Sequence, residues 1–186
     1  MCAITPVIWR GDGPRAPKRH LIYGPAFLYG KDGQIVMFKA NAEEISIRRA
    51  ERTDFESIFP LLEQLWNDRV LDKNRYEQIF LNELSNSRAF MFCASGGKEI
   101  IGFIAGSISE NFYHAGNFAY ISTLITDGPH RGKHIGTRLL DTAVEHARQN
   151  GCLSVELDAN FHRSASHEFY EHYGFRKRAF TFTMGI

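Results

Sequence analysis

The stretch from Pro129 to Cys152, PHRGKHIGTRLLDTAVEHARQNGC, constrains the fold of this chain more than any other segment. Most of it predicts an amphipathic helix, because apolar residues recur at helical spacing and Asn150-Gly151 is typical of a helix end. The apolar face consists of Ile135, Leu139, Leu140, Ala143, Val144 and Ala147. The flanking segments FAYISTLIT and LSVELDA predict two strands. Two strands joined by a loop and a long helix indicate an α/β fold.

The same alternation of strands and helices extends over most of the chain. Further strands are expected at 44–50, 88–94, 100–109 and 176–184, and further helices from near residue 54, over 74–86 and over 164–173. A capping box of Thr53 and Glu56 predicts the start of the first of these helices, and Pro60 predicts a kink or a later start. We expect a mixed central sheet with helices on both faces.

The expected domain organisation follows from a change in sequence pattern near residue 37. With 186 residues, of which 44% are hydrophobic, the chain is long enough for one globular domain with a substantial core. Residues 1–36 are rich in glycine, proline and basic residues and lack regular periodicity, so we expect an N-terminal extension there and the folded domain at 37–186. A short hairpin within 21–36, turning at 31–33, fits the sequence, and a natural start at Met37 stays open.

Charge and cysteine content argue against several classes of protein. The formal net charge is +1, which does not favour a nucleic-acid-binding face, and no run of about 18 apolar residues predicts a membrane span. Cys2, Cys93 and Cys152 show no spacing typical of a metal site or a disulfide framework, so we expect no metal. The lack of a secretory signal pattern and of a disulfide pattern favours the cytoplasm.

The loop before the long helix has the composition of an anion-binding site. The first turn of a helix presents unpaired backbone N–H groups and the positive end of the helix dipole. Gly132 and Gly136 allow the backbone to approach a bulky pyrophosphate, and Arg131 and Lys133 add positive charge. A plain surface loop that caps a core helix is the alternative, because short glycine patterns also occur by chance.

Together with its neighbours, this loop resembles the GCN5-related N-acetyltransferase (GNAT) superfamily over residues 45–184. The family's cofactor loop reads Q/R-x-x-G-x-G/A, and its six places correspond here to Arg131, Gly132, Lys133, His134, Ile135 and Gly136. His134 stands where the family has glycine, so its side chain must point away from the pyrophosphate. A second motif, F-Y-x-x-x-G-F at 169–175, resembles the family independently of the first.

The resemblance implies the GNAT fold and acetyl-CoA as cosubstrate. In the family, the fourth strand of the domain has a bulge and splays from the fifth, and its free backbone groups hold the pantetheine arm and polarise the thioester carbonyl. The fourth strand corresponds here to residues 119–126. Besides the six loop residues, those expected to contact the cosubstrate are Leu124, Ile125, Thr126, Asn160 and Tyr170.

Tyr170 is the residue that the resemblance assigns to the chemistry. The family places a tyrosine hydroxyl near the sulfur, where it protonates the leaving thiolate as general acid, whereas a tyrosine packed in the core is the simpler alternative. Many relatives carry a glutamate base where this sequence has Ser122, and serine alone cannot accept an ammonium proton. Glu110, His114, His130 and a water chain through Ser122 or Thr123 are the candidates for the base.

We therefore expect an acetyl-CoA-dependent N-acetyltransferase that acts on the primary amine of a small molecule by direct attack, without a covalent enzyme intermediate. One alternative is a protein or peptide N-acetyltransferase, with an open acceptor groove in place of a closed pocket. The other is a non-catalytic acetyl-CoA-binding module, which the missing glutamate at Ser122 keeps open. Nucleic acid and membrane are not expected as partners, and a homodimer stays open.

Overall fold

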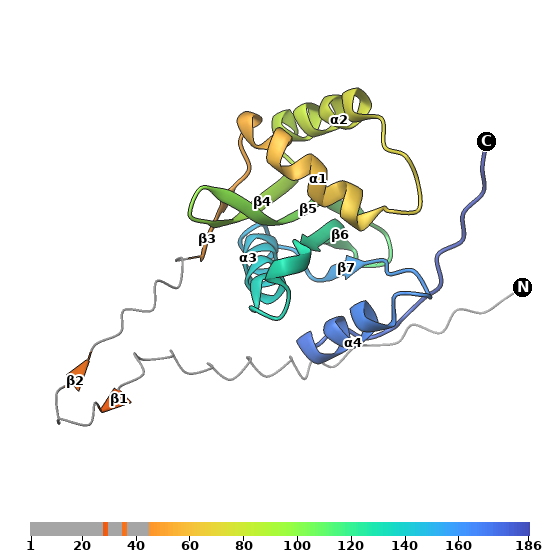
Figure 1. The fold of residues 1–186 in the computed structure, drawn as a ribbon. Coiled ribbons are helices and arrows are strands. Elements are labelled where there is room, and N and C mark those ends of the chain that lie inside the picture. The colour runs from red at the N-terminus through yellow and green to blue at the C-terminus, as the bar shows by residue number, and fades with distance from the viewer. Residues whose placement is uncertain (1–27, 30–34, 37–44) are drawn as a thin grey trace, which may run out of the picture. The chain divides into compact units, whose positions relative to one another are not determined.

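The computed structural model describes residues 28–29, 35–36 and 45–186, and the chain divides into two compact units, Met1–Ala42 and Glu43–Ile186. In the first unit, β1 (Leu28–Tyr29) and β2 (Ile35–Val36) pair antiparallel (Figure 1). This pairing confirms the short hairpin, whereas its expected turn at 31–33 lies outside the described residues. The domain boundary between residues 36 and 37 stays a prediction, and Met37 also lies outside the described residues.

The second unit is built on a five-stranded sheet with the strand order β3-β4-β5-β6-β7. Its strands are β3 (Ile45–Arg49), β4 (Ala89–Gly96), β5 (Glu99–Asn111), β6 (Gly116–Thr126) and β7 (Val155–Leu157). Neighbouring strands are antiparallel except β6 and β7, which are parallel. β4 is buried along its whole length, as its nearly continuous apolar sequence predicts for a strand covered on both faces. The mixed central sheet expected from the sequence is confirmed.

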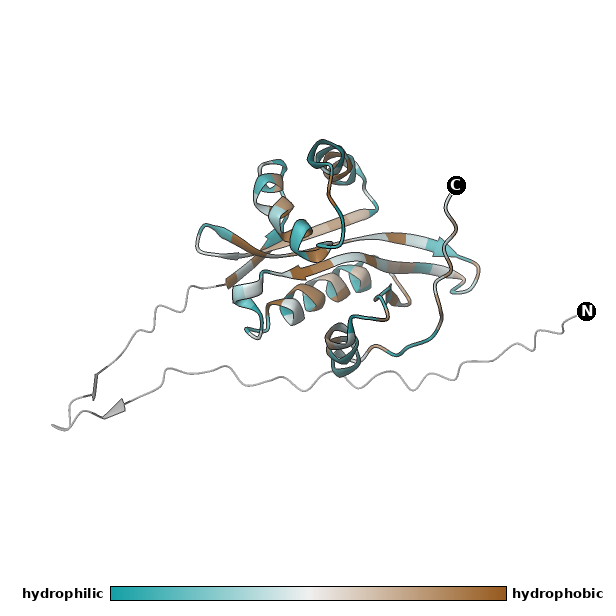
Figure 2. Ribbon diagram, turned by 45° about the vertical axis from the view of Figure 1, so that its right-hand side comes forward, coloured by the Kyte–Doolittle hydropathy of each residue, from teal (hydrophilic) through white to brown (hydrophobic). Residues whose placement is uncertain are grey.

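Helices cover both faces of this sheet, as expected (Figure 2). They are α1 (Phe55–Leu65), α2 (Lys73–Ser85), α3 (Ile135–Gln149) and α4 (Ser164–Tyr173), with two short 3-10 helices, η1 (Arg52–Asp54) and η2 (Gly128–His130). α1 and α2 pack on one face, in a hydrophobic cluster that includes Cys93 and Phe103. α3 packs on the other face, where Phe92, Leu139 and Leu140 belong to a second cluster. The two clusters take alternate residues of β4, because successive side chains of a strand point to opposite faces.

Most of the predicted helix ends agree with the structure. α3 ends at Gln149, next to the predicted end at Asn150-Gly151, and Gly174 caps α4. α1 runs continuously through Pro60, so the alternative of a later start is wrong, whereas the kink stays a prediction. β7 is shorter than the predicted strand at 153–159.

A bulge interrupts β6 at Ser122. The partners of Ile121 and Thr123 on β5 are consecutive residues, so Ser122 between them is left without a partner there. Ile121 packs in the α3 cluster, whereas Ile125 packs in the α1 cluster, although an even number of positions separates them. An extra residue in a strand reverses the alternation in this way. The bulge expected in this strand is confirmed.

α1 begins next to the predicted position near residue 54, but the capping box before it differs from the prediction. A capping box of Glu51 and Asp54 at η1 takes the place of the expected box of Thr53 and Glu56. The N–H of Glu51 donates to the Asp54 carboxylate at 2.7 Å. Arg48 fixes this carboxylate through two further hydrogen bonds, at 2.6 and 2.7 Å. An ion pair with the preceding strand therefore decides where the helix begins.

The last predicted strand, at 176–184, is wrong. The residues after α4 form no helix or strand, and the large side chains Phe180, Phe182 and Met184 are exposed. Their alternation with small polar residues is typical of a strand, but a strand also needs a backbone partner. This segment reaches β7 through side chains, such as the Arg178 guanidinium that donates to Glu156 at 2.6 Å.

Candidate active site

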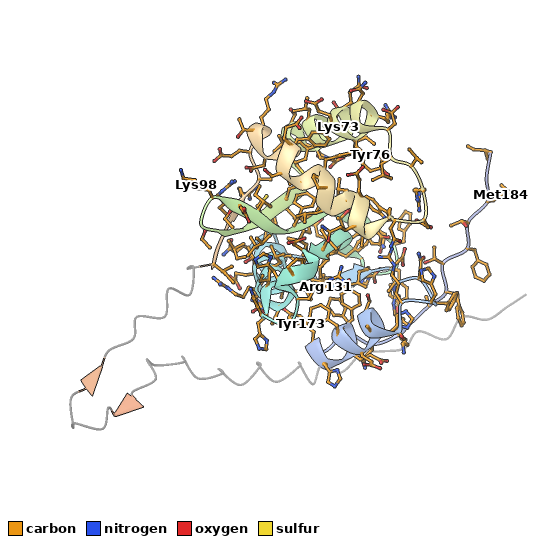
Figure 3. All side chains as sticks on the ribbon, viewed as in Figure 1. Lys73, Tyr76, Lys98, Arg131, Tyr173 and Met184 are labelled. Atoms are coloured by element: carbon orange, nitrogen blue, oxygen red, sulfur yellow. The ribbon has the colours of Figure 1, made fainter. Side chains whose placement is uncertain are left out.

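The loop between β6 and α3 turns sharply just before the helix begins. Gly132 and His134 both have left-handed backbone conformations, with φ of 78° and 58°. A glycine adopts this conformation without strain, and the His134 side chain is exposed. Arg131 lies at the start of the loop, where its Nε donates to the carbonyl of Thr126 at 3.3 Å (Figure 3). The loop thus returns to the end of β6 and then leads directly into α3.

Several backbone N–H groups of this loop are free to bind an anion. Arg138 is the first residue of α3 whose N–H has a recorded acceptor, the carbonyl of His134 at 3.1 Å. From Gly132 to Thr137, no N–H has an acceptor among the described residues. Arg131 and Lys133 are exposed beside these groups. The loop therefore has the donors and the charge that a pyrophosphate requires, so the residues present fit the phosphate end of a coenzyme A.

Gly136 lies where three elements come close together. A Cβ added to this residue would lie 3.3 Å from Cζ of Phe169 in α4 and 3.7 Å from Oγ1 of Thr126 in β6. Such a contact with an aromatic ring is tighter than ordinary van der Waals contact. Glycine at this position therefore lets the first turn of α3 approach both α4 and the end of β6.

A glutamine on α1 forms hydrogen bonds with the segment before this loop, although α1 and α3 pack on opposite faces of the sheet. Gln64 donates to the Asp127 carboxylate at 2.9 Å and accepts from the N–H of Gly128 at 3.2 Å. His130 contacts the other Asp127 oxygen at 3.0 Å. The hydrogen bond from Gln64, followed by that of His130, lowers the pKa of Asp127. Sequence reasoning missed Gln64, because this residue contacts residues more than 60 positions later in the chain.

β6 and β7 diverge beyond three paired positions. Ala119, Tyr120 and Ile121 pair with the three residues of β7, and the next residues of β6 have no partner on β7. Leu124, Ile125 and Thr126, which were expected to contact the cosubstrate, lie on this diverging part and pair only with β5. The backbone groups that point away from β5 there are available to a ligand. The predicted splayed pair of strands is confirmed, and its gap opens toward the loop.

Two expected residues lie on the far side of this gap. Asn160 is exposed in the turn after β7, where its carbonyl accepts from the N–H of Arg163 at 2.9 Å. Tyr170 follows in α4, with its ring 5.4 Å from Phe169 and 5.7 Å from Phe175. Because Phe169 also meets Gly136, α4 places Tyr170 next to the start of α3. The cosubstrate-binding role of each residue stays a prediction.

The Tyr170 hydroxyl differs from those of two other tyrosines near the sheet. Tyr120 donates to Asp158 at 2.7 Å and Tyr173 donates to Asp141 at 2.8 Å, whereas no hydrogen bond of the Tyr170 hydroxyl is recorded among the described residues. Burial raises the pKa of Tyr170 above its ordinary value, so the hydroxyl keeps its proton in neutral solution. A protonated hydroxyl without a fixed partner suits a general acid.

The candidates for the base lie at different places. Ser122 is exposed at the bulge and donates to the carbonyl of Ala105 at 3.3 Å. Glu110 is exposed and faces Asn117 near the other end of the β5–β6 hairpin, roughly 16 Å from Ser122 at about 3.3 Å per strand residue.

The two candidate histidines are each held by a carboxylate. Nε2 of His114 lies 2.8 Å from Glu156 of β7, and Nδ1 of His130 lies 3.0 Å from Asp127. Neither histidine is at the bulge, and Ser122 is therefore the candidate nearest to the point where the strands diverge. The roles of Glu110, His114, His130 and Ser122 as bases stay predictions.

The splayed strand pair and the free N–H groups before α3 fit a protein that binds a phosphate-containing cofactor. Comparison with known proteins identifies the family. The model of the acetyltransferase (GNAT) family matches residues 52–175. An aminoalkylphosphonate N-acetyltransferase of Salmonella typhimurium is 30% identical over 140 residues, which cover 75% of this chain and 90% of that protein. An uncharacterized N-acetyltransferase of Bacillus subtilis is 28% identical over 134 residues, covering 68% and 92%. This chain belongs to the GNAT family and is an N-acetyltransferase.

Solved structures agree with this assignment. A putative acetyltransferase from Agrobacterium tumefaciens superposes with a TM-score of 0.68 at 24% identity, covering 76% of this chain and 99% of that one. An aminoglycoside N-acetyltransferase in complex with CoA superposes with a TM-score of 0.71 at 16% identity, covering 79% and 97%. At these identities the likeness concerns the fold. The family and its fold support acetyl-CoA as the cosubstrate, as the sequence predicts.

Two features are lacking among the described residues. None of their helices is long and apolar enough to cross a membrane. Among the same residues, no group of three or more His, Cys, Asp or Glu side chains is arranged to hold a metal ion.

Proposed function

We propose that this protein transfers the acetyl group of acetyl-CoA to the primary amine of a small molecule, without a covalent enzyme intermediate. The observation that carries the proposal is the meeting of three features at one end of the sheet. These are the free N–H groups of the loop before α3, the unpaired part of β6 and the free hydroxyl of Tyr170. Each supplies one requirement of acyl transfer: binding, polarisation and protonation.

Different residues along the gap between β6 and β7 bind the phosphate end and the thioester end of the cosubstrate. The N–H groups from Gly132 to Thr137, with Arg131 and Lys133, bind the pyrophosphate. Backbone groups at Leu124, Ile125 and Thr126 orient the pantetheine arm and polarise the thioester carbonyl. A bound acetyl-CoA supplies an activated acetyl group, whose carbonyl carbon the amine attacks.

Two protons move in this reaction. The amine loses one when its nitrogen bonds to carbon, and the sulfur gains one when the carbon–sulfur bond breaks. Tyr170 donates the second proton, which its raised pKa keeps available in neutral solution. The first leaves through water, because Ser122 at the bulge is exposed to solvent and a serine hydroxyl alone cannot accept the proton.

One relative of this chain whose substrate is named supports a small-molecule acceptor. The Salmonella protein, 30% identical, acts by its name on aminoalkylphosphonates. A structural neighbour is an aminoglycoside acetyltransferase in complex with sisomicin. Both acceptors are small molecules with primary amines, which supports the same class for this chain.

Thiol release against a panel of amines tests the proposal. The full chain is incubated with acetyl-CoA and 2-aminoethylphosphonate, spermidine, glucosamine, kanamycin or a lysine-containing peptide, and free CoA thiol is measured. We expect turnover with at least one small amine and none with the peptide. Turnover with the peptide alone would favour a peptide N-acetyltransferase. Tight CoA binding without any turnover would favour a non-catalytic binding module.

A further inference from the structure

One face of β6 and β7 carries a set of polar side chains that the proposed reaction has not used. Val155 and Leu157 of β7 pack against the α3 cluster, so Glu156 between them points to the opposite face. Tyr120 of β6 points to the same face, because its neighbours belong to the α3 cluster. Its hydroxyl donates to Oδ2 of Asp158 at 2.7 Å, which places Asp158 on this face as well.

The two carboxylates on this face differ in their partners. Glu156 forms an ion pair with the Arg178 guanidinium at 2.6 Å and also contacts Nε2 of His114 at 2.8 Å. Within the described part of the chain, Asp158 accepts hydrogen bonds only from neutral hydroxyls, that of Tyr120 and that of Thr181 at 3.0 Å. Among the described residues, no Lys, Arg or His forms an ion pair with Asp158. Its negative charge is therefore oriented by two hydrogen bonds but not neutralised.

Asp158 also lies where β6 and β7 separate. Ile121 and Leu157 are the last paired residues of the two strands. The next residues are Ser122, at the bulge, and Asp158, so both lie at the start of the gap. Burial, followed by the hydrogen bond to Asp158, raises the pKa of Tyr120 to about 12. The Tyr120 hydroxyl therefore keeps its proton, and stays a hydrogen-bond donor, at neutral and moderately alkaline pH. The carboxylate is thus held in place beside the region assigned to the acetyl group.

We infer that Asp158 is the specificity-determining residue of the acceptor site and binds the ammonium group of a basic alkyl amine. The inference rests on the proposed function, because it takes the gap beside Ser122 as the place of reaction. An oriented carboxylate with an uncompensated charge attracts a cation and aligns its hydrogen bonds. The substrate class is therefore alkyl amines that arrive protonated, rather than weakly basic aromatic amines. The bound ammonium group first gives one proton to water, and the neutral amine then attacks and loses its second proton as in the proposed reaction.

The Asp158→Asn variant tests this inference, because it removes the charge and keeps the shape of the side chain. With the alkyl amine that the wild type acetylates, we expect KM for the amine to rise roughly tenfold to hundredfold, as for the loss of a charge-assisted hydrogen bond. KM for acetyl-CoA should stay unchanged. In the wild type, KM for the amine should also rise with added NaCl, whereas in the variant it should respond weakly, because salt screens charges.

Asp141→Asn is a matched control. Asp141 on α3 accepts from the Tyr173 hydroxyl at 2.8 Å, so this variant also loses the charged half of a Tyr–Asp pair. It should leave KM for the amine unchanged. The Asp158→Glu variant, which keeps the charge, should recover part of the loss.

Three outcomes separate the possible failures. An unchanged amine KM in Asp158→Asn, or the same rise in Asp141→Asn, would overturn the role of Asp158 and leave the proposed function intact. A wild type that binds CoA but acetylates no amine would overturn both. A reduced melting temperature in Asp158→Asn with a salt-dependent, wild-type KM would assign Asp158 a structural role instead.

Discussion

Gly136 and Phe169 bring the first turn of α3 into contact with α4: a Cβ on Gly136 would lie 3.3 Å from Cζ of Phe169. Tyr170 is the next residue of α4, and the free N–H groups of the loop lie just before Gly136. The part of the site that would bind phosphate and the part that would donate a proton therefore share one packing contact. A change at Gly136 acts on both.

Replacing Gly136 by aspartate is predicted to weaken CoA binding. The added carboxylate repels the pyrophosphate at the positive end of the helix dipole, and its Cβ displaces Phe169. We expect the dissociation constant of CoA, measured by calorimetry, to rise by at least roughly tenfold, the effect of about 1.4 kcal/mol. The loss should be similar for acetyl-CoA.

Gly151→Ala provides the control for this change. Gly151 has a φ of 68° at the other end of α3, and a Cβ there would meet no atom within 4 Å. The substitution should cost about 1 kcal/mol of stability, because alanine adopts a left-handed conformation poorly, and should leave CoA affinity unchanged. Wild-type CoA affinity in Gly136→Asp would remove the loop from the binding site.

The link between α1 and the loop gives a second prediction. Gln64→Leu removes both hydrogen bonds to Asp127 and Gly128, so the loop loses its connection to the opposite layer. We expect KM for acetyl-CoA to rise roughly threefold to tenfold, as for the loss of one or two ordinary hydrogen bonds, with kcat nearly unchanged. In Gln149→Leu, at the exposed end of α3, steady-state kinetics should match the wild type. Equal KM values in all three proteins would show that the loop is positioned without Gln64.

Much of the fold was predictable because local pattern and final structure agree. β3 to β6 and α2 to α4 follow from alternation, helical spacing and end signals such as Gly174. The strand at 176–184 was not, because alternation shows only that a segment can form a strand. Whether Phe180 and its neighbours find a backbone partner depends on the edge of β7, which their own sequence does not specify.

The residues of the site were also predictable from the sequence only where they form a local feature. The loop before α3 is a local feature, so its six residues were found from the sequence and its resemblance. The contacts of Asp127 with Gln64 and of Asp158 with Tyr120 join residues 63 and 38 positions apart. Only strand register and helix packing bring such residues together, and both are properties of the folded domain.

The ion pair of Arg48 and Asp54 gives a prediction on stability. The hydrogen bonds from Arg48 lower the pKa of Asp54 below its ordinary value of 3.8, although burial opposes them. A carboxyl whose pKa is lower in the folded state stabilises the fold above its unfolded pKa, and this contribution is lost as the pH falls through the folded pKa. Asp54→Asn should therefore be less stable at pH 7 by about 2 kcal/mol, less than for a fully buried pair because Arg48 is partly exposed.

Urea unfolding at several pH values measures this effect. The difference in the free energy of unfolding between wild type and Asp54→Asn should reach its largest value from pH 5 to 7. It should shrink below pH 3.8, where the unfolded carboxyl becomes protonated. Asp68→Asn is the control, because Asp68 forms an exposed pair with Arg69 at 3.6 Å and should change stability by less than about 0.5 kcal/mol. A difference that persists unchanged at low pH would show that packing, not charge, makes Asp54 important.

The last prediction concerns the hydroxyl of Tyr170. Tyr170→Phe keeps the ring against Phe169 and Phe175 and removes only the proton donor, so CoA affinity and melting temperature should be retained. We expect kcat to fall roughly 100-fold, the lower end for general acid catalysis, because a CoA thiolate is a fairly good leaving group. Tyr173→Phe, which loses a hydroxyl bound to Asp141, should keep kcat within about twofold, since its hydroxyl does not face the gap in the proposed reaction.

The pH dependence of kcat separates a proton donor from a packing residue. Tyr170 acts in its protonated form, and burial raises its pKa above the ordinary value of 10.0. Wild-type kcat should therefore hold up to about pH 10 and fall above it, whereas the low kcat of Tyr170→Phe should show no such fall. The measurement needs an acceptor for which product release is not rate-limiting, as established by a pre-steady-state burst experiment. Wild-type kcat in Tyr170→Phe under these conditions would show that Tyr170 is a packing residue of the hydrophobic core and not the proton donor.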